Sequence, residues 1–392
     1  MIFKKLFTLL FIVASFTTNA QLQLTEASQI SILTMGPGQS LNDAFGHSAI
    51  RIKDPVYKFD IVFDYGRYDF ESEGFYLKFV QGQLDYEIGQ SDYEDFFRLY
   101  QYQQRRVSEQ ILGLSIAQKT AFYLFLKENS KPENKIYPYD FFYNNCATKI
   151  IDGIEIVLND QIVYEPSTSF EPLTFRDLIR SDLNQNSWGS FGIDIALGSK
   201  IDQIASVEEH LFLPKYLFQL LGNSRLQTTK AALVSETKIL NPSDTIAYNN
   251  FFNSPLFILG ILALIMLLIT YKDYKNNTRS KWLDLGLFTA TGFIGVLLLL
   301  LWFATDHTAT EYNYNLLWAC ALNVLFIPSI TKTQLNNRGI SYIKFLLVIL
   351  CLMGLHWLTG VQSFAIGLIP LLIAICVRYL FLIHHFKAAN RG

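Results

Sequence analysis

The chain has 392 residues, a formal net charge of −2 and a 51% share of hydrophobic residues. Acidic and basic residues are mixed along it, and no basic stripe occurs, so the composition excludes a nucleic-acid-binding protein. The sequence contains neither an internal repeat nor a low-complexity segment, which excludes a repeat architecture.

The N-terminus has the pattern of a secretory signal. It reads MIFKKLFTLLFIVASFTTNAQ, in which Lys4 and Lys5 precede a short apolar run. The run is too short to span a bilayer, and a small-residue cleavage motif ends at Ala20. We expect a signal peptide over residues 1–20 and a mature chain from Gln21; the alternative is a buried N-terminal helix. No Cys follows the run, so the protein is not expected to be a lipoprotein itself.

Residues 21–253 have the length of one globular domain. Alternating polar and apolar residues predict strands over 29–35, 46–53 and 59–68, with a turn-rich loop over 36–45. The stretch 92–130 indicates two helices. After Cys146 the apolar residues recur at spacings of three and four, which predicts a further helix. This mixture of strands and helices indicates an α+β domain.

Cys146 stands in the stretch YNNCATKII and is the only cysteine before residue 320. Asn144 or Asn145 is suited to cap the following helix, which places Cys146 in its first turn. The helix dipole lowers the pKa of a thiol there, and the thiolate is a nucleophile. An unpaired thiol is also unusual outside the cytoplasm. The alternatives are a plain buried Cys or a disulfide with Cys320.

A thiolate nucleophile needs a base, and the soluble region contains two histidines. His47 lies on a predicted strand directly after Gly46, where another group can approach closely. His210 lies among helix-forming residues near the end of the domain. A strand His facing a helix-terminal Cys is suited to acyl transfer. We therefore favour a Cys146–His47 pair, against the alternative that both residues are structural.

The C-terminal third predicts a membrane domain. Five apolar runs, each close to the length of a spanning helix, cover about 255–271, 284–304, 315–331, 342–359 and 364–384. The third is short and contains Pro328. Positive charges gather in the first and third connections and in the tail, which holds Arg378, Lys387 and Arg391. Positive loops stay in the cytoplasm, so residues 21–253 should lie outside it and the C-terminus inside.

Several separated stretches together resemble the Lnb-type lipoprotein N-acyltransferase family. They are GPGQSLNDAFGHSAIRIKDP, FDYGRYDFESEGFYLKFVQGQLDY and PENKIYPYDFFYNNCATKI, then GIDIALGSKID, LFLPKYL and DHTATEYNYNLLW. Their number and order make the resemblance specific. It implies a periplasmic α+β domain with a permuted papain-like fold, as in NlpC/P60 and LRAT-type enzymes, followed by an all-α domain of about five transmembrane helices.

The resemblance implies a catalytic dyad of Cys146 and His47. Asp64, in VFDYG, is the candidate to orient His47, although the family more usually has Asn there. An Asp favours the imidazolium, whereas an Asn only orients the ring. The neighbouring alternatives for this third residue are Asp43, Asp60 and Asp69.

Further residues are candidates for binding or positioning. Asn144 and Asn145 are candidates for an oxyanion hole with the Cys146 N–H, against a plain capping role, and Tyr65 is a positioning candidate. For lipid head groups the candidates are Arg51 and Arg67, against surface ion pairs. Further candidates for binding substrate lie in the membrane domain. His307, Asp306, Glu311 and Asn313 are in the second outer loop, and His356 is near the outer end of the fourth span.

The family implies transfer of an acyl chain from a phospholipid donor, through a Cys146 thioester, to the α-amine of a diacylated lipoprotein. The reaction needs no metal or other cofactor, and the protein should lie in the inner (cytoplasmic) membrane. Three alternatives remain: a cell-wall amidase or peptidase, an intramolecular lipoprotein transacylase, and a non-enzymatic membrane sensor.

Overall fold

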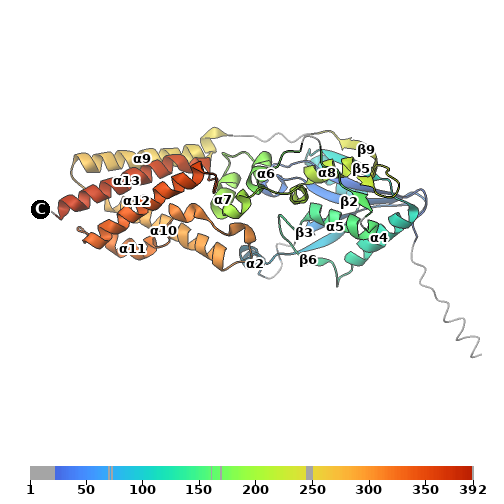
Figure 1. Ribbon diagram of the computed structural model, residues 1–392, viewed down its shortest axis with the longest axis horizontal. Helices are drawn as coiled ribbons and strands as arrows, with labels where there is room; N and C mark the ends of the chain where they lie inside the picture. The colour runs from blue at the N-terminus through green and yellow to red at the C-terminus, as the bar shows by residue number, and fades with distance from the viewer. Residues whose placement is uncertain are drawn as a thin grey trace, which may run out of the picture.

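The computed structural model describes residues 23–68, 71, 74–159, 161–167, 170–243 and 250–390. The predicted signal peptide and Asp69 lie outside these residues. The molecule is elongated, with an α+β domain at one end and a helical bundle at the other (Figure 1). The predicted fold class, an α+β domain followed by a helical membrane domain, is confirmed; the permuted papain-like order stays a prediction.

A seven-stranded antiparallel sheet forms the centre of the α+β domain, in the order β6-β4-β3-β2-β1-β5-β9. The strands are β1 (Gln29–Met35), β2 (His47–Asp54), β3 (Phe59–Arg67), β4 (Asp85–Asp92), β5 (Val107–Leu112), β6 (Ile136–Pro138) and β9 (Val234–Asn241). The first three agree with the predicted strands. In the stretch 92–130 the helices α3 (Tyr93–Tyr102) and α4 (Ile116–Asn129) are present, but β5 lies between them and was not predicted.

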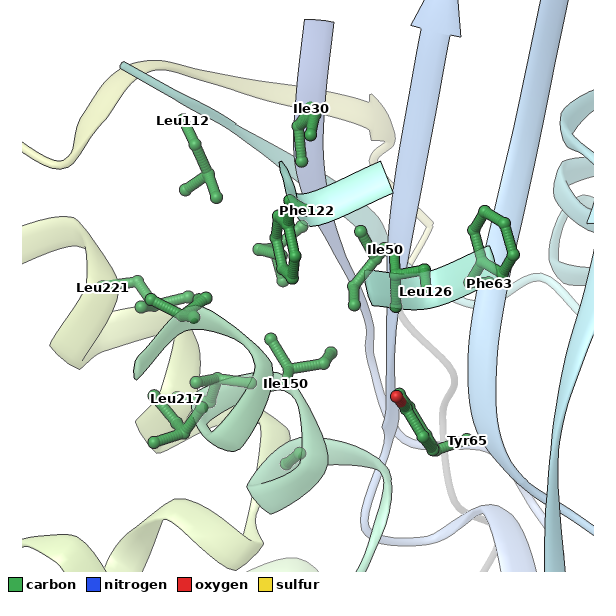
Figure 2. Close-up of a cluster of buried hydrophobic side chains, with 14 of the residues drawn as sticks. Ile30, Ile50, Phe63, Tyr65, Leu112, Phe122, Leu126, Ile150, Leu217 and Leu221 are labelled. Carbon is green, nitrogen blue, oxygen red and sulfur yellow. The ribbon is translucent and has the colours of Figure 1, made fainter. Parts of the chain in front are cut away.

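One face of the sheet packs against α4, α5 (Cys146–Leu158) and α8 (Pro214–Asn223). Figure 2 shows Ile50 and Phe63 of the sheet facing Phe122 of α4 and Ile150 of α5. Leu217 of α8 closes the same cluster. Each fully buried side chain of this kind contributes about 1.5–3 kcal/mol, so this core fixes α5 against the sheet. On the opposite face α3 packs on β2 and β3.

Smaller elements connect this core to the bundle. They are α2 (Phe75–Gln81), α6 (Phe175–Asp182), α7 (Trp188–Ala196), the strand pair β7 (Ile162–Val163) and β8 (Arg225–Leu226), and several 3-10 turns, including η3 (Glu208–Phe212). Helices α6 and α7 lie between the sheet and the bundle (Figure 1).

Among the described residues, four helices are long and apolar enough to span a membrane. They are α9 (Pro255–Lys275), α10 (Lys281–Phe303), α12 (Asn337–Leu358) and α13 (Ile369–Ala389). The third predicted span, 315–331, is therefore not a continuous helix. That segment consists of the 3-10 turn η6 (Tyr314–Leu317) and the eight-residue helix α11 (Asn323–Ile330).

Two features interrupt this third segment. Pro328 lies inside α11, where it removes a backbone donor. On α10, Gly292 and Gly295 let the segment's backbone approach so closely that a Cβ on Gly295 would lie 2.1 Å from the Ala319 carbonyl oxygen. The segment still joins the two ends of the bundle. Asn315 bonds to the Asp194 carbonyl at the α+β domain, and Ile330 accepts from Arg279 at the far end.

Arg378, counted above with the positive tail, instead lies buried inside α13. Its guanidinium donates to Asp273 and to Asp284, each at 2.7 Å. A charge in the membrane interior is tolerated when it is paired in this way, so these contacts tie α13 to α9 and α10.

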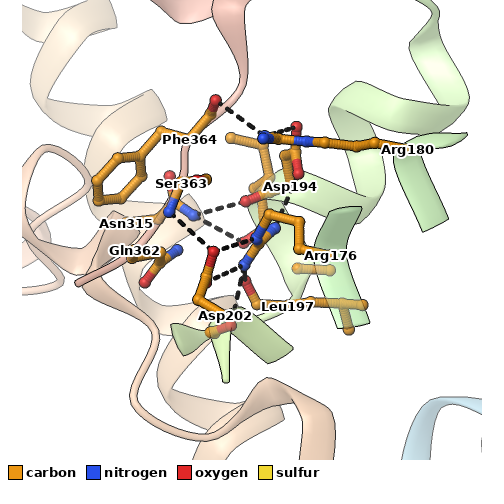
Figure 3. A network of polar contacts seen from close by, with 12 residues as sticks. Arg176, Arg180, Asp194, Leu197, Asp202, Asn315, Gln362, Ser363 and Phe364 are labelled. Carbon is orange, nitrogen blue, oxygen red and sulfur yellow. Dashed lines mark hydrogen bonds and ion pairs between the residues drawn. The ribbon is translucent and has the colours of Figure 1, made fainter. Parts of the chain in front are cut away.

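A polar network joins the α+β domain to the bundle, as Figure 3 shows. Arg176 of α6 donates to Asp194 at 2.8 Å and to Asp202 at 2.9 Å. Arg180 donates to the other oxygen of Asp194 at 2.9 Å. Across the interface, the Ser363 N–H donates to Asp202 at 3.0 Å. These contacts fix α6 and α7 on the loop between α12 and α13.

Candidate active site

His47 is the first residue of β2, and its position depends on the preceding glycine. Gly46 has φ +79°, and a Cβ there would lie 2.6 Å from the Met35 carbonyl oxygen, so a glycine is needed. Since β2 and β3 are antiparallel, the start of β2 and the end of β3 lie at the same end of the sheet. His47 Nε2 is 3.5 Å from Asp64 Oδ2, and the two side chains are 20% and 9% exposed.

Cys146 is the first residue of α5, as predicted from its spacing, and Asn145 caps the helix. Asn145 Oδ1 accepts from the Ala147 N–H at 2.8 Å and the Thr148 N–H at 3.1 Å. Its Nδ2 donates to two backbone carbonyls at 2.8 Å, one of them in η3. The amide is therefore fully used in holding the helix start. The capping alternative is confirmed for Asn145, and its side chain has no donor left for an oxyanion hole.

Asn144 holds the turn that precedes α5. Its side-chain amide donates to the Pro138 carbonyl, and its backbone pairs in both directions with Asp140, at 3.0 and 3.2 Å. Within the described part of the chain, the Cys146 N–H has no intramolecular acceptor, as expected in the first turn of a helix. The backbone N–H of Cys146 is therefore free to donate a hydrogen bond beside the sulfur, whereas the Asn145 amide is not.

The thiol and the imidazole perturb each other. Burial would raise the pKa of Cys146, but the charge of His47, its hydrogen bond and the Ser48 backbone N–H lower this pKa overall. Burial would likewise lower the pKa of His47. Electrostatic interactions with Tyr100 and Cys146, together with hydrogen bonds to Asp64 and Cys146, raise it well above its ordinary value. Both shifts favour a thiolate–imidazolium pair.

Among the candidate Asp residues that the structure describes, Asp64 is the one that contacts His47. Burial would raise its pKa, but hydrogen bonds from His47 and Arg67 lower it, so it stays a carboxylate beside the imidazole. Arg67 Nε donates to Asp64 Oδ1 at 2.9 Å, which gives Arg67 the ion-pair role rather than a lipid-phosphate role. The rival candidates are committed elsewhere, Asp43 to Arg105 and Asp60 to Arg51.

Two candidates are held by other contacts. Tyr65 is 4% exposed and packs in the core against Tyr137, with ring centroids 5.8 Å apart. Arg51 is buried between Asp60 at 2.6 Å and Glu109 at 3.0 Å. Its guanidinium is therefore not available to a lipid head group, and the prediction of a substrate-binding Arg51 is wrong.

The candidates in the second outer loop hold the two domains together. The His307 ring bonds to the Phe79 carbonyl oxygen of α2 at 2.9 Å. Asn313 is 1% exposed and donates to the carbonyls of Ile195 and Ala196 at 2.8 and 3.0 Å, at the end of α7. Glu311 pairs with Lys200. The expected substrate-binding role of Asn313 is therefore wrong, because its amide holds α7.

The other two candidate histidines are packed against aromatic rings, and the cysteines are unpaired. The ring of His210 is 1% exposed, bonds to the Ser206 carbonyl at 2.6 Å and packs on Phe170. His356 packs edge-on against Tyr314, with centroids 4.4 Å apart. All four cysteines lie among the described residues and are free thiols. The alternative of a disulfide between Cys146 and Cys320 is excluded.

Two backbone contacts to Cys146 were not predicted from the sequence. One is the Ser48 N–H at the sulfur. The other is Gly66, which has φ +96° and whose added Cβ would lie 3.8 Å from the Cys146 Cβ. A glycine inside a strand often marks such a close approach, so Gly66 in FDYGRY was the signal that could have found it.

The fold and the site together define a membrane protein whose α+β domain holds a half-buried thiol and imidazole next to a buried carboxylate. A family model described as the Lnb N-terminal periplasmic domain matches residues 16–181, and one described as the Lnb transmembrane domain matches residues 247–389. Together they cover most of the chain, which belongs to the Lnb family. No curated protein and no solved structure matches it. Membership indicates an acyltransferase of the lipoprotein N-acylating kind.

Proposed function

We propose that the protein is a lipoprotein N-acyltransferase that uses Cys146 as nucleophile and His47 as acid and base. It moves an acyl chain from a membrane phospholipid to the free α-amine of a diacylglyceryl-Cys lipoprotein. The observation that carries this proposal is the position of Cys146 at a helix N-terminus next to His47, whose ring lies 3.5 Å from the Asp64 carboxylate. In this arrangement the pKa of Cys146 is lowered and the pKa of His47 is raised. A thiolate kept in this way is suited to attack an ester.

In the first half-reaction the Cys146 thiolate attacks an ester carbonyl of the phospholipid. The developing oxyanion accepts a hydrogen bond from the Cys146 N–H. The ester C–O bond then breaks, and the lysophospholipid oxygen takes the proton from the His47 imidazolium. A thioester remains on Cys146, and His47 is left neutral, with Asp64 holding its ring.

In the second half-reaction the lipoprotein amine attacks the thioester carbonyl. His47, now neutral, accepts the amine proton, and the C–S bond breaks to release the Cys146 thiolate. The products are an amide on the lipoprotein and the original thiolate–imidazolium pair. Because the phospholipid ester supplies the acyl group, the reaction needs no metal, nucleotide or organic cofactor.

We also propose the placement of the protein in the cell. The inner membrane holds the bundle, the α+β domain lies in the periplasm, and the C-terminus lies in the cytoplasm. The positive charges of the first and third connections support this orientation. Both substrates are lipids that are retained in the bilayer at about 0.8 kcal/mol per buried methylene, which favours a site held close to the membrane.

The test combines two mass-spectrometric measurements. The purified full chain in phospholipid nanodiscs should acquire one acyl mass on Cys146, and Cys146→Ala should acquire none. Cys351→Ala, which changes an exposed thiol in α12, is the matched control and should behave as wild type. An unacylated wild-type protein would favour the amidase or the sensor instead.

Lipoprotein N-termini from cells carrying the protein should hold three acyl chains. Two redistributed chains would point to intramolecular transfer, since that reaction moves a chain from the lipoprotein's own glycerol. If Cys146→Ala or His47→Ala left lipoprotein acylation unchanged, the non-enzymatic sensor would be the better interpretation.

A further inference from the structure

Helix α2 belongs to the α+β domain but contacts the membrane domain. It lies beside the outer end of α10 in Figure 1. The Asp306 N–H donates to the Gln81 carbonyl at 2.8 Å, and the His307 ring bonds to the Phe79 carbonyl at 2.9 Å. Both contacts come from the loop that follows α10, so α2 is held where α10 leaves the bundle.

That end of α10 has the composition of a membrane–water boundary. Trp302 stacks on Phe303 with centroids 4.7 Å apart, and Tyr312 packs against Trp302 at 5.4 Å. Phe303 is 71% and Tyr312 50% exposed. Exposed aromatic rings gather at the level of the lipid head groups. Helix α2 therefore lies at the outer surface of the membrane.

Helix α2 presents an apolar surface at this level. Leu77 is 63% exposed, Val80 is 50% exposed and Phe79 is 49% exposed. Leu77 and Val80 are three residues apart and share one face of the helix. In water such a face would be unfavourable, but beside the aromatic boundary of the bundle it continues the lipid-facing surface. This continuity identifies lipid as the occupant.

A row of aromatic rings leads from this face into the α+β domain. Successive ring centroids are 6.3, 6.0, 5.0 and 4.2 Å apart along Phe79, Phe75, Tyr68, Tyr86 and Tyr139. At the inner end, Tyr139 and Cys146 pack against the same hydrophobic core cluster. The row thus leads from α2 to the part of the hydrophobic core that contains Cys146.

We propose that the face of α2 formed by Leu77 and Val80 inserts into the outer leaflet, and that a phospholipid acyl chain reaches Cys146 along this aromatic row. The second part rests on the proposed function, whereas the insertion of α2 does not. An acyl chain that follows the row avoids exposure to water, which is the main cost of moving a lipid out of a bilayer.

The insertion is tested by photocrosslinking of the full chain in phospholipid nanodiscs. The crosslinking residue p-benzoylphenylalanine replaces Leu77 or Val80, and the control replaces Tyr102, which is 87% exposed at the end of α3. We expect phospholipid adducts by mass spectrometry at both α2 positions, at least fivefold above the control. Equal yields at all three positions would overturn the insertion.

The delivery path is tested with the double variant Leu77→Asp/Val80→Asp. A matched control, Val56→Asp/Tyr102→Asp, adds the same charge at positions 61% and 87% exposed. Acylation of Cys146 by bilayer phospholipid should fall at least tenfold in the α2 variant only. Acylation by a short-chain phospholipid, supplied as monomers in water, should stay within twofold of wild type.

The outcomes separate the two proposals. An equal loss with both donors, or no loss with either, would overturn the delivery path. If wild type forms no acyl-Cys146 with either donor, the proposed function fails, and with it the delivery path. The crosslinking yields then still decide whether α2 contacts lipid.

Discussion

Replacing Arg176 by Met should weaken the attachment of the α+β domain to the bundle. Arg176 is 1% exposed and donates five hydrogen bonds, three to the carboxylates of Asp194 and Asp202 and two to backbone carbonyls (Figure 3). Met fills a similar volume, so the change removes charge and donors with little loss of packing. Asp194 keeps Arg180, and Asp202 keeps the Ser363 N–H.

Removing one partner of a buried ion pair costs about 3–5 kcal/mol. Because both carboxylates keep one partner, we expect Arg176→Met to lower the free energy of unfolding by about 3 kcal/mol, the lower end of this range. For a domain of this size, 1 kcal/mol lowers Tm by about 2–4 °C, so the expected decrease is about 6–12 °C. Arg176→Lys should fall between wild type and Arg176→Met, because an ammonium lacks the planar set of donors.

The assay is thermal unfolding of the full chain in detergent, followed by near-ultraviolet circular dichroism. The matched control is Arg98→Met, which removes an ion pair with Asp95 at 3.6 Å in which both side chains are 71% exposed. Exposed pairs contribute about 0–1 kcal/mol. If Arg176→Met were as stable as Arg98→Met, the buried network would not hold the domain, and this reasoning would be refuted.

Three further predictions concern the site. Cys146→Ser should lower lipoprotein acylation by about 10³-fold or more, and acyl-enzyme on intact-mass spectra should disappear; an undiminished acyl mass would contradict a Cys146 thioester. In His47→Ala the pKa of Cys146 should rise, because His47 lowers this pKa in the wild type. The pH midpoint for alkylation of Cys146 by iodoacetamide should therefore move upward. An unchanged alkylation profile would show that His47 does not act on Cys146. Asn145→Ala should lower the free energy of unfolding by about 1–2 kcal/mol, because the helix α5 loses its N-cap. In the same unfolding assay Asn144→Ala should lower it by less. Equal decreases for the two variants would argue against the capping role of Asn145.

The local parts of the site could be predicted from the sequence. An Asn before a run of apolar residues at spacings of three and four identifies a helix start, and this placed Cys146 in the first turn of α5. An alternating pattern after Gly46 placed His47 on a strand. Both features depend on neighbours in the chain, which is why the pattern sufficed.

The parts that depend on distant neighbours were not predictable in this way. The Asn145 amide is used up partly by a carbonyl of η3, far away in the sequence. Arg51 is buried because Glu109, on β5, reaches it across the sheet. The third membrane segment is interrupted where the glycines of α10 admit its backbone. Each outcome depends on packing between elements that no local window contains.

The edge strand β9 has a consequence for how the protein is made. It pairs with β5, yet it is synthesised after α8 and shortly before α9. The sheet can therefore be completed only when the first membrane helix is about to follow, which couples maturation of the periplasmic part to insertion of the bundle. A secreted fragment ending at residue 181 would lack α8 and β9, leave the edge of β5 unpaired and be prone to aggregate; an expression boundary after residue 241 keeps both.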